Sequence, residues 1–115
     1  MKRIDLRSIS IKDATFSILD FETTGLSAIN ERVIEVGLIK IKNFKIIDSY
    51  QTLINPERSI PSEITKLTGI TNLDVKKAPR FSVVAEEISN LIEDTILVAH
   101  NFNFDYSFLK SEFNL

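Results

Sequence analysis

The chain has 115 residues, of which 43% are hydrophobic and 26% charged, and it contains no cysteine. This length fits one domain, since domains usually have about 100–200 residues. The apolar content excludes a disordered chain, and the lack of cysteine excludes disulfides and zinc–thiolate sites. No apolar run approaches the roughly 20 residues that span a bilayer, so we expect no membrane insertion.

The charges are nearly balanced, because 14 Lys and Arg stand against 16 Asp and Glu, for a net charge of −2. This balance lacks the basic footprint of a protein that holds long duplexes. Residues 1–7 contain no apolar core of a secretory signal, which predicts a cytoplasmic location. We expect residues 1–13 to form an N-terminal extension and residues 14–115 to form one domain.

The first half of the chain predicts three strands. Alternating β-branched and aromatic residues favour a strand over 15–21, and turn residues follow it at 23–25. The near-continuous apolar run over 32–41 is typical of a strand covered on both faces. A tight turn at 42–43 leads into a third strand over 45–54. Four residues of this strand are expected to share one face: Ile46, Tyr50, Thr52 and Ile54.

Helical spacing dominates the second half of the chain. A short helix is predicted over 61–67, with Gly69 as its C-terminal stop. Apolar residues at i+3 and i+4 predict an amphipathic helix over 81–93. Residues 96–99 are a candidate central strand, and a last helix begins near Asn103. This order predicts an α/β architecture in which an antiparallel meander feeds a parallel strand.

Two acidic residues stand at the end of the first predicted strand. Asp20 and Glu22 are two residues apart, so the period of a strand places both on one side, about 7 Å apart along the chain. Converging carboxylates repel each other unless a cation lies between them, and Mg²⁺ is bound by one or two carboxylates together with substrate phosphate. The structural alternative is that both side chains solvate a strand end and cap a turn.

Asp105 falls in the first turn of the last predicted helix, directly after the strand that closes at His100. Because that strand is expected beside the first one, Asp105 is expected to approach Asp20 and Glu22. The structural alternative for Asp105 is an interaction with the helix dipole, worth about 0.3–1 kcal/mol. His100 is interpreted as a residue that closes the strand, and the two asparagines that flank residue 102 are interpreted as helix caps.

Two segments resemble motifs of one enzyme family. The first motif of the DnaQ-like 3′→5′ exonucleases, which carry a D-E-D-D acidic set, is similar to Asp20-Phe21-Glu22-Thr23-Thr24-Gly25-Leu26. Their second motif is similar to Ala99-His100-Asn101-Phe102-Asn103-Phe104-Asp105. Three connecting segments match in order and spacing: 32–37, 54–56 and 68–71. The resemblance covers about residues 14–115, and it is closer to polymerase-associated members than to RNA-trimming ones.

The resemblance implies a fold and a metal site. The family fold is a ribonuclease-H-like mixed sheet of strand order 3-2-1-4-5 with flanking helices, and this sequence supplies strands 3-2-1-4. The resemblance also implies two Mg²⁺ or Mn²⁺ ions, with Asp20 bridging both, Glu22 on one and Asp105 on the other. Two such ions stabilise the attacking and leaving oxygens of phosphodiester hydrolysis. Glu35 is interpreted as structural and Gly37 as a close-packing position.

The resemblance further implies which residues contact the terminal nucleotide of a single-stranded DNA 3′ end. Gly25 permits close backbone approach, and Leu26 wedges against the base. The full expected set is Phe21, Thr23, Thr24, Gly25, Leu26, Thr68, Ile70, His100, Asn101 and Phe104. Thr68 stands where the family usually has His, and Phe102 replaces a usually small residue.

The family's third motif, which supplies a fourth metal-binding Asp and a His general base, has no counterpart in this sequence. We therefore expect a partial 3′→5′ exonuclease domain over 14–115, with an apolar face of the sheet left exposed. Three functions compete. The chain is a metal-dependent 3′→5′ exonuclease that proofreads DNA beside a replicative DNA polymerase, a weak or inactive fragment that binds nucleic acid, or a fragment that docks on a polymerase or self-associates through the exposed face.

Overall fold

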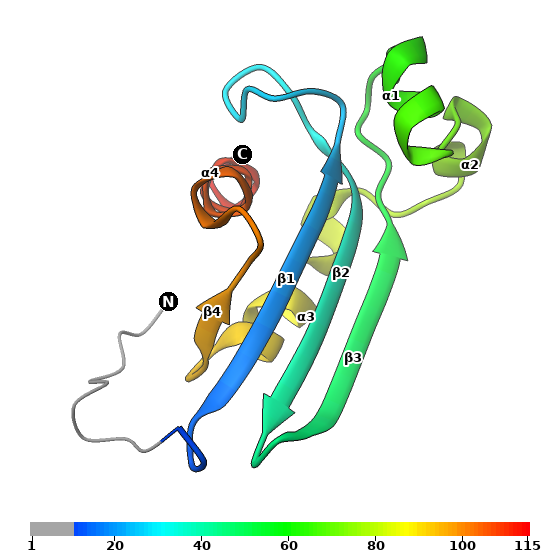
Figure 1. The fold of residues 1–115 in the computed structure, drawn as a ribbon. Helices are drawn as coiled ribbons and strands as arrows, with labels where there is room; N and C mark the ends of the chain where they lie inside the picture. Colours follow the sequence, from blue (N-terminus) through cyan, green and yellow to red (C-terminus); the bar gives the residue numbers. More distant parts are fainter. Residues whose placement is uncertain (1–10) are drawn as a thin grey trace.

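A computed structural model describes residues 11–115, and in these residues the chain forms four strands and four helices (Figure 1). The strands are β1 (Thr15–Thr23), β2 (Val33–Lys42), β3 (Lys45–Leu53) and β4 (Ile96–Val98). The helices are α1 (Ser62–Thr68), α2 (Asn72–Lys76), α3 (Phe81–Ile92) and α4 (Phe102–Phe113). Of the expected N-terminal extension, residues 1–10 lie outside the described residues, as does the segment on which the cytoplasmic prediction depends.

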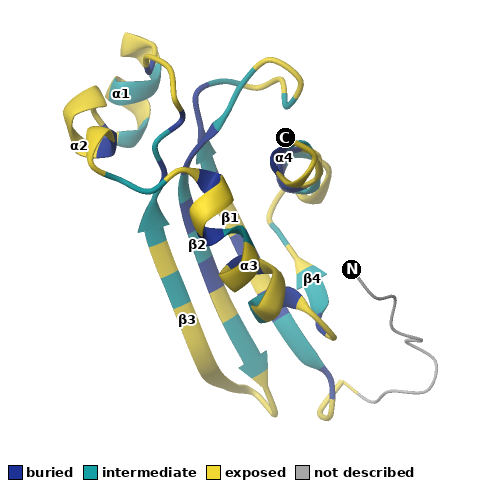
Figure 2. Cartoon of the chain, turned by 180° about the vertical axis from the view of Figure 1, so that it is seen from behind, coloured by how far each residue is buried: buried dark blue, intermediate teal, exposed yellow. Residues whose placement is uncertain are grey.

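The four strands form one sheet of order β3-β2-β1-β4, which is the order that the resemblance implied. β1 pairs antiparallel with β2, β2 pairs antiparallel with β3, and β4 pairs in parallel with residues 16–18 of β1. α3 lies across one face of the sheet, and α4 lies beside β1 beyond the end of the short β4 (Figures 1 and 2). The predicted α/β architecture is therefore confirmed. No helix in residues 11–115 has the length and apolarity needed to cross a membrane.

The main core lies between the sheet and the helices α3 and α4 because alternate residues of β1 face them. Leu19 and Phe21 are 1% and 4% exposed, whereas the residue between them, Asp20, faces the other side of the sheet. The core residues are Leu19, Phe21, Val33, Val36, Leu38, Ile54, Phe81, Val84, Ile88, Ile92, Phe108 and Leu109. A second cluster lies at the α1–α2 end of the sheet: Ile34, Ile60, Ile70 and Val75.

Specific residues explain where the two short helices α1 and α2 end or begin, but the sequence pattern predicted only α1. α1 ends at Gly69, whose φ of 79° is the left-handed conformation that glycine adopts without strain, so the predicted stop is confirmed. α2 begins with a capping box in which Thr71 and Asp74 bond each other's backbone N–H. The spacing of Thr71 and Asp74 is the usual signature of such a helix start, and it was the available signal for the missed helix.

The face of the sheet opposite α3 is open. Ile18, Ile39 and Val98 are each 38% exposed there, so the prediction that β2 is covered on both faces is wrong. β4 is half-exposed at the edge of the sheet instead of being a buried central strand, because β1 is its only neighbour among the described residues. An exposed apolar face was expected from the sequence, and these residues form it.

A β-bulge changes which residues of β3 face the core. Lys40 pairs with Asp48, but the next residue, Ile41, pairs with Ile46, so β3 contains one extra residue at this point. Ile46 therefore lies on the open face, whereas Tyr50 packs against the main core. The prediction that Ile46 and Tyr50 share a face is wrong, because a one-residue shift inverts the alternation of side chains.

Candidate active site

Asp105 lies in the first turn of α4 and is 4% exposed. Its Oδ1 accepts a hydrogen bond from the backbone N–H of Phe21 at 3.0 Å. β4 pairs with β1 only as far as Ile18, so no strand in residues 11–115 lies beside the β4-side edge of β1 beyond that residue. The end of β4 and the start of α4 thus bring a carboxylate to the backbone of β1 from a position 84 residues later in the chain.

Asp20 and Glu22 flank Phe21 on β1 and face the open side of the sheet. Asp20 is exposed and Glu22 is half-buried, whereas Phe21 between them is in the core. Across the ladder, Asp20 pairs with Gly37 and Glu22 pairs with Glu35. The alternation of β1 therefore places both carboxylates on one face, as the sequence predicted.

Gly37 is not a close-packing position. A Cβ added to it would lie 3.7 Å from the carbonyl oxygen of Asp20, which is an ordinary van der Waals contact. The absence of a side chain instead contributes to a shallow hollow of about 380 Å³ on the open face, which Asp20 and Ile39 also line. The prediction of close packing is wrong, and Gly37 leaves space beside Asp20.

Burial and neighbouring charges raise the pKa values of two of these carboxylates. Burial raises the pKa of Glu22, and the negative charges of Asp20, Glu35 and Asp105 raise it further. Burial also raises the pKa of Asp105, against the opposing effect of the N–H of Phe21, and Asp20 raises it further. Asp20 and Asp105 are therefore close enough to Glu22, and Asp20 to Asp105, for their negative charges to act on these two pKa values.

The chemistry of this donor set fits a hard divalent cation. Carboxylate oxygens are the ligands that Mg²⁺ and Mn²⁺ prefer, and a cation would relieve the repulsion that raises the two pKa values. Among residues 11–115, no group of three or more His, Asp or Glu side chains is arranged so that it could hold a metal ion as the side chains stand. Asp20, Glu22 and Asp105 are the residues that would hold a cation here.

The hydroxyl groups of the two threonines after β1 form hydrogen bonds within the loop that follows. Thr23 Oγ1 donates to the carbonyl of Gly25 at 2.6 Å, and Thr24 Oγ1 donates to Glu31 Oε2 at 2.5 Å. A Cβ on Gly25 would lie 2.9 Å from Cγ of Glu31, so glycine is needed for this packing. Leu26, in contrast, is 88% exposed. Of these predicted substrate-contacting residues, Leu26 offers a free side chain and the threonines build the loop that carries it.

The start of α4 contains three more predicted substrate contacts. His100 is exposed, and it opposes, without reversing, the rise that burial causes in the pKa of Asp105. Asn101 caps α4, because its side chain accepts a hydrogen bond from the N–H of Phe104 at 3.5 Å. The ring of Phe104 packs against that of Phe108, with centroids 5.0 Å apart.

Two further expectations concern the same turn of α4. Asn103 lies inside α4, where its carbonyl accepts a hydrogen bond from Ser107 Oγ at 2.6 Å, so its predicted role as a cap is wrong. The ring of Phe102 stacks on that of Tyr106, with centroids 5.2 Å apart. Phe102 remains 42% exposed and forms part of the surface next to His100.

Thr68 is the last residue of α1, and Ile70 follows its Gly69 cap; α1 lies toward the β3 edge of the sheet and α4 toward the β4 edge (Figure 1). Thr68 Oγ1 donates to the carbonyl of Ile64 at 2.8 Å and accepts from the N–H of Ile70 at 3.1 Å. Ile70 is 7% exposed and belongs to the second apolar cluster. Both residues therefore stabilise the end of α1 and its packing on the second apolar cluster.

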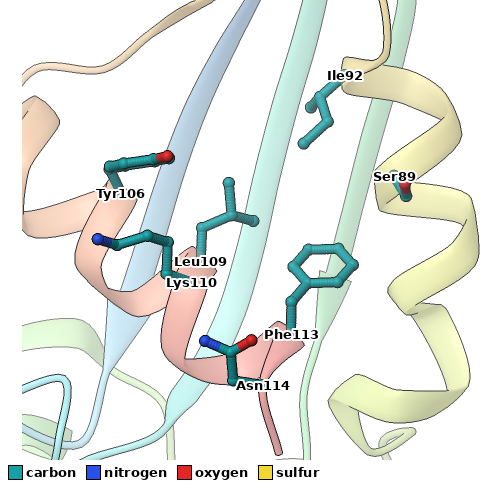
Figure 3. Close-up of a pocket in the computed structure, with 7 residues that line it drawn as sticks. All are labelled: Ser89, Ile92, Tyr106, Leu109, Lys110, Phe113 and Asn114. Atoms are coloured by element: carbon teal, nitrogen blue, oxygen red, sulfur yellow. The ribbon is translucent and has the colours of Figure 1, made fainter. Parts of the chain in front are cut away.

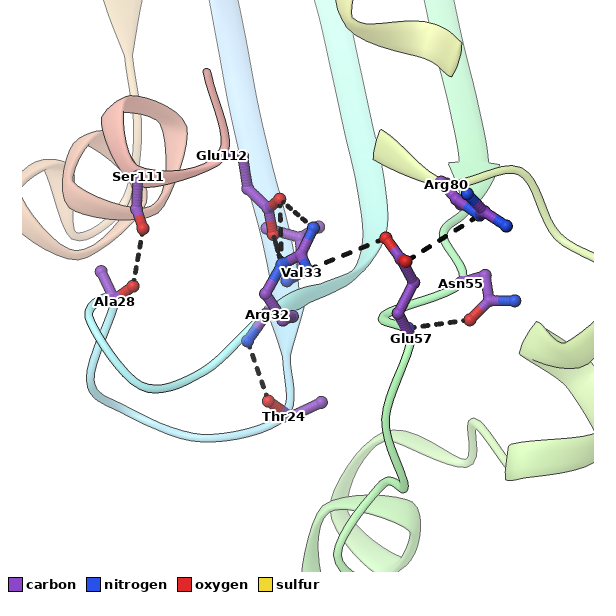
Figure 4. Close-up of polar contacts among 9 residues, drawn as sticks. All are labelled: Thr24, Ala28, Arg32, Val33, Asn55, Glu57, Arg80, Ser111 and Glu112. Atoms are coloured by element: carbon purple, nitrogen blue, oxygen red, sulfur yellow. Dashed lines mark hydrogen bonds and ion pairs between the residues drawn. The ribbon is translucent and has the colours of Figure 1, made fainter. Parts of the chain in front are cut away.

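Sequence reasoning missed an ion pair between Arg32 and Glu112, 80 residues apart, which fastens α4 to the loop after β1 (Figure 4). Glu112 is seven residues after Asp105, so the two carboxylates share one face of α4. This spacing was the only signal, because nothing local in the sequence indicates Arg32 as the partner.

A groove of about 380 Å³ lies between α3 and α4, away from the carboxylates (Figure 3). Ser89 and Ile92 of α3 line one side, and Tyr106, Lys110 and Phe113 of α4 line the other. It contains no acidic residue, and the ammonium of Lys110 lies 5.1 Å from the ring centroid of Tyr106. The chemistry of the site is therefore on the open face and at the β1 edge, and not in this groove.

Comparisons with known proteins agree with this geometry. The family model described as "RNase_T: Exonuclease" matches residues 17–115. A PolC-type DNA polymerase III of Caldanaerobacter subterraneus subsp. tengcongensis is 49% identical over 100 residues, which are 87% of this chain and 7% of that protein. The DNA polymerase III subunit epsilon of Treponema pallidum is 42% identical over 100 residues, 87% of this chain and 46% of that protein.

The fold also matches solved structures. Exonuclease I of E. coli in complex with a dA16 oligonucleotide superposes with a TM-score of 0.80 over 89% of this chain and 24% of that one, at 21% sequence identity. Apo exonuclease I gives the same TM-score. The chain thus spans less than half the length of each of these relatives.

Proposed function

The chain belongs to the exonuclease family RNase_T, and from this premise we propose that it removes nucleotides from the 3′ end of single-stranded DNA with the help of divalent cations. The observation that carries the proposal is the meeting of the two matched motifs. Asp105, from the second motif, accepts a hydrogen bond from the backbone of Phe21, which lies between the two carboxylates of the first motif.

The proposed reaction is a hydrolysis. Water attacks the phosphorus that joins the last two nucleotides, and the bond from that phosphorus to the 3′ oxygen breaks. A nucleoside 5′-monophosphate leaves, and the shortened strand keeps a 3′ hydroxyl. Two Mg²⁺ or Mn²⁺ ions, when bound, stabilise the charge on the attacking and leaving oxygens. Asp20, Glu22 and Asp105 hold them, and Leu26 lies against the terminal base.

We place this activity in proofreading, beside a replicative polymerase in the cytoplasm. The support is in the relatives, which are named as DNA polymerase III PolC-type and as the epsilon subunit of DNA polymerase III. A solved neighbour of the same fold holds a single-stranded oligonucleotide. These partners are proposals for this chain, because it spans only part of each relative.

A second candidate is a weak or inactive domain that binds DNA ends or docks on another protein. The apolar open face supports it, since exposed apolar patches mark interaction sites. A general base contributes about 10²–10⁴-fold to the rate of such a reaction. The three carboxylates of the site are proposed as metal ligands, and none of them is proposed as the general base. This candidate predicts binding of 3′ ends with little or no release of nucleotide.

The test is release of labelled mononucleotide from a 3′-labelled single strand in the presence of Mn²⁺. We expect Asp20→Asn to lose at least about 100-fold in rate, because it removes a charge that holds the cations. Asp48→Asn, an exposed aspartate of β3, is the matched control and should retain the parent rate. Equal rates for the parent and Asp20→Asn would contradict the metal assignment, and binding without release would favour the second candidate.

A further inference from the structure

Glu112 is a buried carboxylate of α4 that lies apart from the three candidate metal ligands. Its side chain is 2% exposed, and both oxygens are bonded. Arg32 donates from Nε to Oε1 and Oε2 at 3.1 and 3.0 Å and from Nη2 to Oε1 at 2.8 Å (Figure 4). The backbone N–H of Val33 donates to Oε2 at 3.0 Å. A carboxylate is buried at low cost only when it is paired in this way, so these contacts fix the position of Arg32.

Arg32, in turn, closes the loop that joins β1 to β2. Its N–H donates to Thr24 Oγ1 at 3.0 Å, and its carbonyl accepts from the N–H of Thr24 at 2.8 Å. Ser111, next to Glu112 on α4, donates from Oγ to the carbonyl of Ala28 in the middle of the loop at 2.8 Å. α4 therefore holds the loop at its middle and at its end.

The same face of α4 carries Asp105. The N–H of Phe21 donates to Asp105 and the N–H of Val33 donates to Glu112, each at 3.0 Å. The register of the β1–β2 ladder shifts between Glu22 and Thr23, which lies between these two attachment points. One helix thus fixes the strand that carries two candidate ligands and the loop that follows the shift.

We propose that Glu112 is a positioning residue for the 3′ end of a polynucleotide: through Arg32 it sets where the loop of residues 24–32, with the exposed Leu26, stands relative to Asp105. This inference rests on the proposed function, which assigns the loop to the terminal nucleotide. Glu112 does not touch the reacting atoms. Loss of its charge loosens the loop and leaves the three candidate metal ligands in place.

The test compares Glu112→Gln with the parent in the full-length natural protein. The probe is a single-stranded oligodeoxynucleotide with a 3′ hydroxyl and a 5′ fluorophore, and Ca²⁺ replaces Mg²⁺ so that binding is measured without cleavage. We expect Kd to rise about tenfold, since a charge-assisted contact that holds the loop is lost. We expect the affinity for Mn²⁺ alone to stay unchanged. The double variant Arg32→Gln/Glu112→Gln removes both charges and leaves no buried carboxylate unpaired. It should have the same two effects, which covers the case in which Glu112→Gln fails to fold.

Two controls separate positioning from general stability. Glu86→Gln changes an exposed glutamate of α3, and Val84→Ala weakens the core under α3; both should bind the probe as the parent does. The inference is overturned if folded Glu112→Gln binds like the parent, or if Val84→Ala with an equal loss of Tm weakens binding equally. If the parent fails to bind the probe, the proposed function and this inference are both overturned. If the parent and folded Glu112→Gln bind the probe with equal Kd, only this inference is overturned.

Discussion

Burial and three neighbouring carboxylates all raise the pKa of Glu22. The folded chain therefore holds the proton of Glu22 more tightly than the unfolded chain does. Its contribution to the free energy of unfolding is full below the ordinary pKa and falls as the pH rises through the raised pKa, because in this range the folded state binds more protons than the unfolded state. At neutral pH the ionised side chain destabilises the folded protein.

Glu22→Gln should accordingly be more stable than the parent at neutral pH in the absence of divalent cations. The advantage should disappear below the ordinary pKa of 4.5, where Glu22 is protonated in both states. Mn²⁺ should raise the Tm of the parent more than that of the variant, because it neutralises the same charge. Urea denaturation across pH, with and without Mn²⁺, measures both effects. A variant less stable than the parent at neutral pH would contradict the assignment of repulsion to this site.

The residues of the site were predictable to different degrees. Asp20 and Glu22 share a strand, so the period of two alone places them on one face. Asp105 needed the additional expectation that β4 lies beside β1, which the sheet order confirms. Glu112 was not predictable, because a glutamate on an amphipathic helix has no local signal for a partner 80 residues away.

Among the elements, α2 depends on its capping box. Thr71 Oγ1 accepts from the N–H of Asp74 at 3.1 Å, and Asp74 accepts from the N–H of Thr71 at 2.9 Å, which lowers the pKa of Asp74. The helix has five residues and one buried side chain, Val75. Helices this short are marginal without a cap and tertiary packing.

Thr71→Ala should therefore lower the free energy of unfolding by about 1 kcal/mol, the usual cost of losing an N-cap side chain. Thr71→Ser is the matched control, because serine supplies the same acceptor, and it should stay close to the parent. Chemical denaturation measures both variants. Equal stability of Thr71→Ala and the parent would show that packing of Val75 alone holds α2.

The elements also show where periodicity stops being informative. The strands and the longer helices were predicted to within about two residues because their apolar periods are regular. The bulge at Lys40–Ile41 was not predictable, because an extra residue leaves composition unchanged and only inverts the side chains beyond it. α2 was missed because five residues are too few to establish a helical period.

At the scale of the whole molecule, the two faces of the sheet differ. α3 covers one face (Figure 2). The other face exposes Ile18, Ile39 and Val98. Such a surface favours association with any complementary apolar face, including a second copy of this chain. The region around Asp20 belongs to the same face, so association there would compete with access to the candidate ligands.

We expect the chain to self-associate with increasing concentration through this face. Ile39→Lys should weaken the association, because a charge replaces one of the exposed apolar side chains of this face. Val83→Lys, at a residue of α3 that is 70% exposed on the opposite side, is the matched control and should associate like the parent. Sedimentation velocity over a range of concentrations compares the three proteins. An equal effect of both substitutions would locate the association elsewhere.

The spacing on α4 limits how this helix can change. Asp105 and Glu112 meet two backbone donors on adjacent strands, and they are separated by about 10 Å of helix rise and almost two full turns. Replacing an outward-facing residue between them leaves this arrangement intact. Inserting or deleting one residue turns Glu112 by about 100° and removes it from Arg32 while Asp105 keeps its bond. The interval between the two carboxylates can therefore vary in composition but not in length.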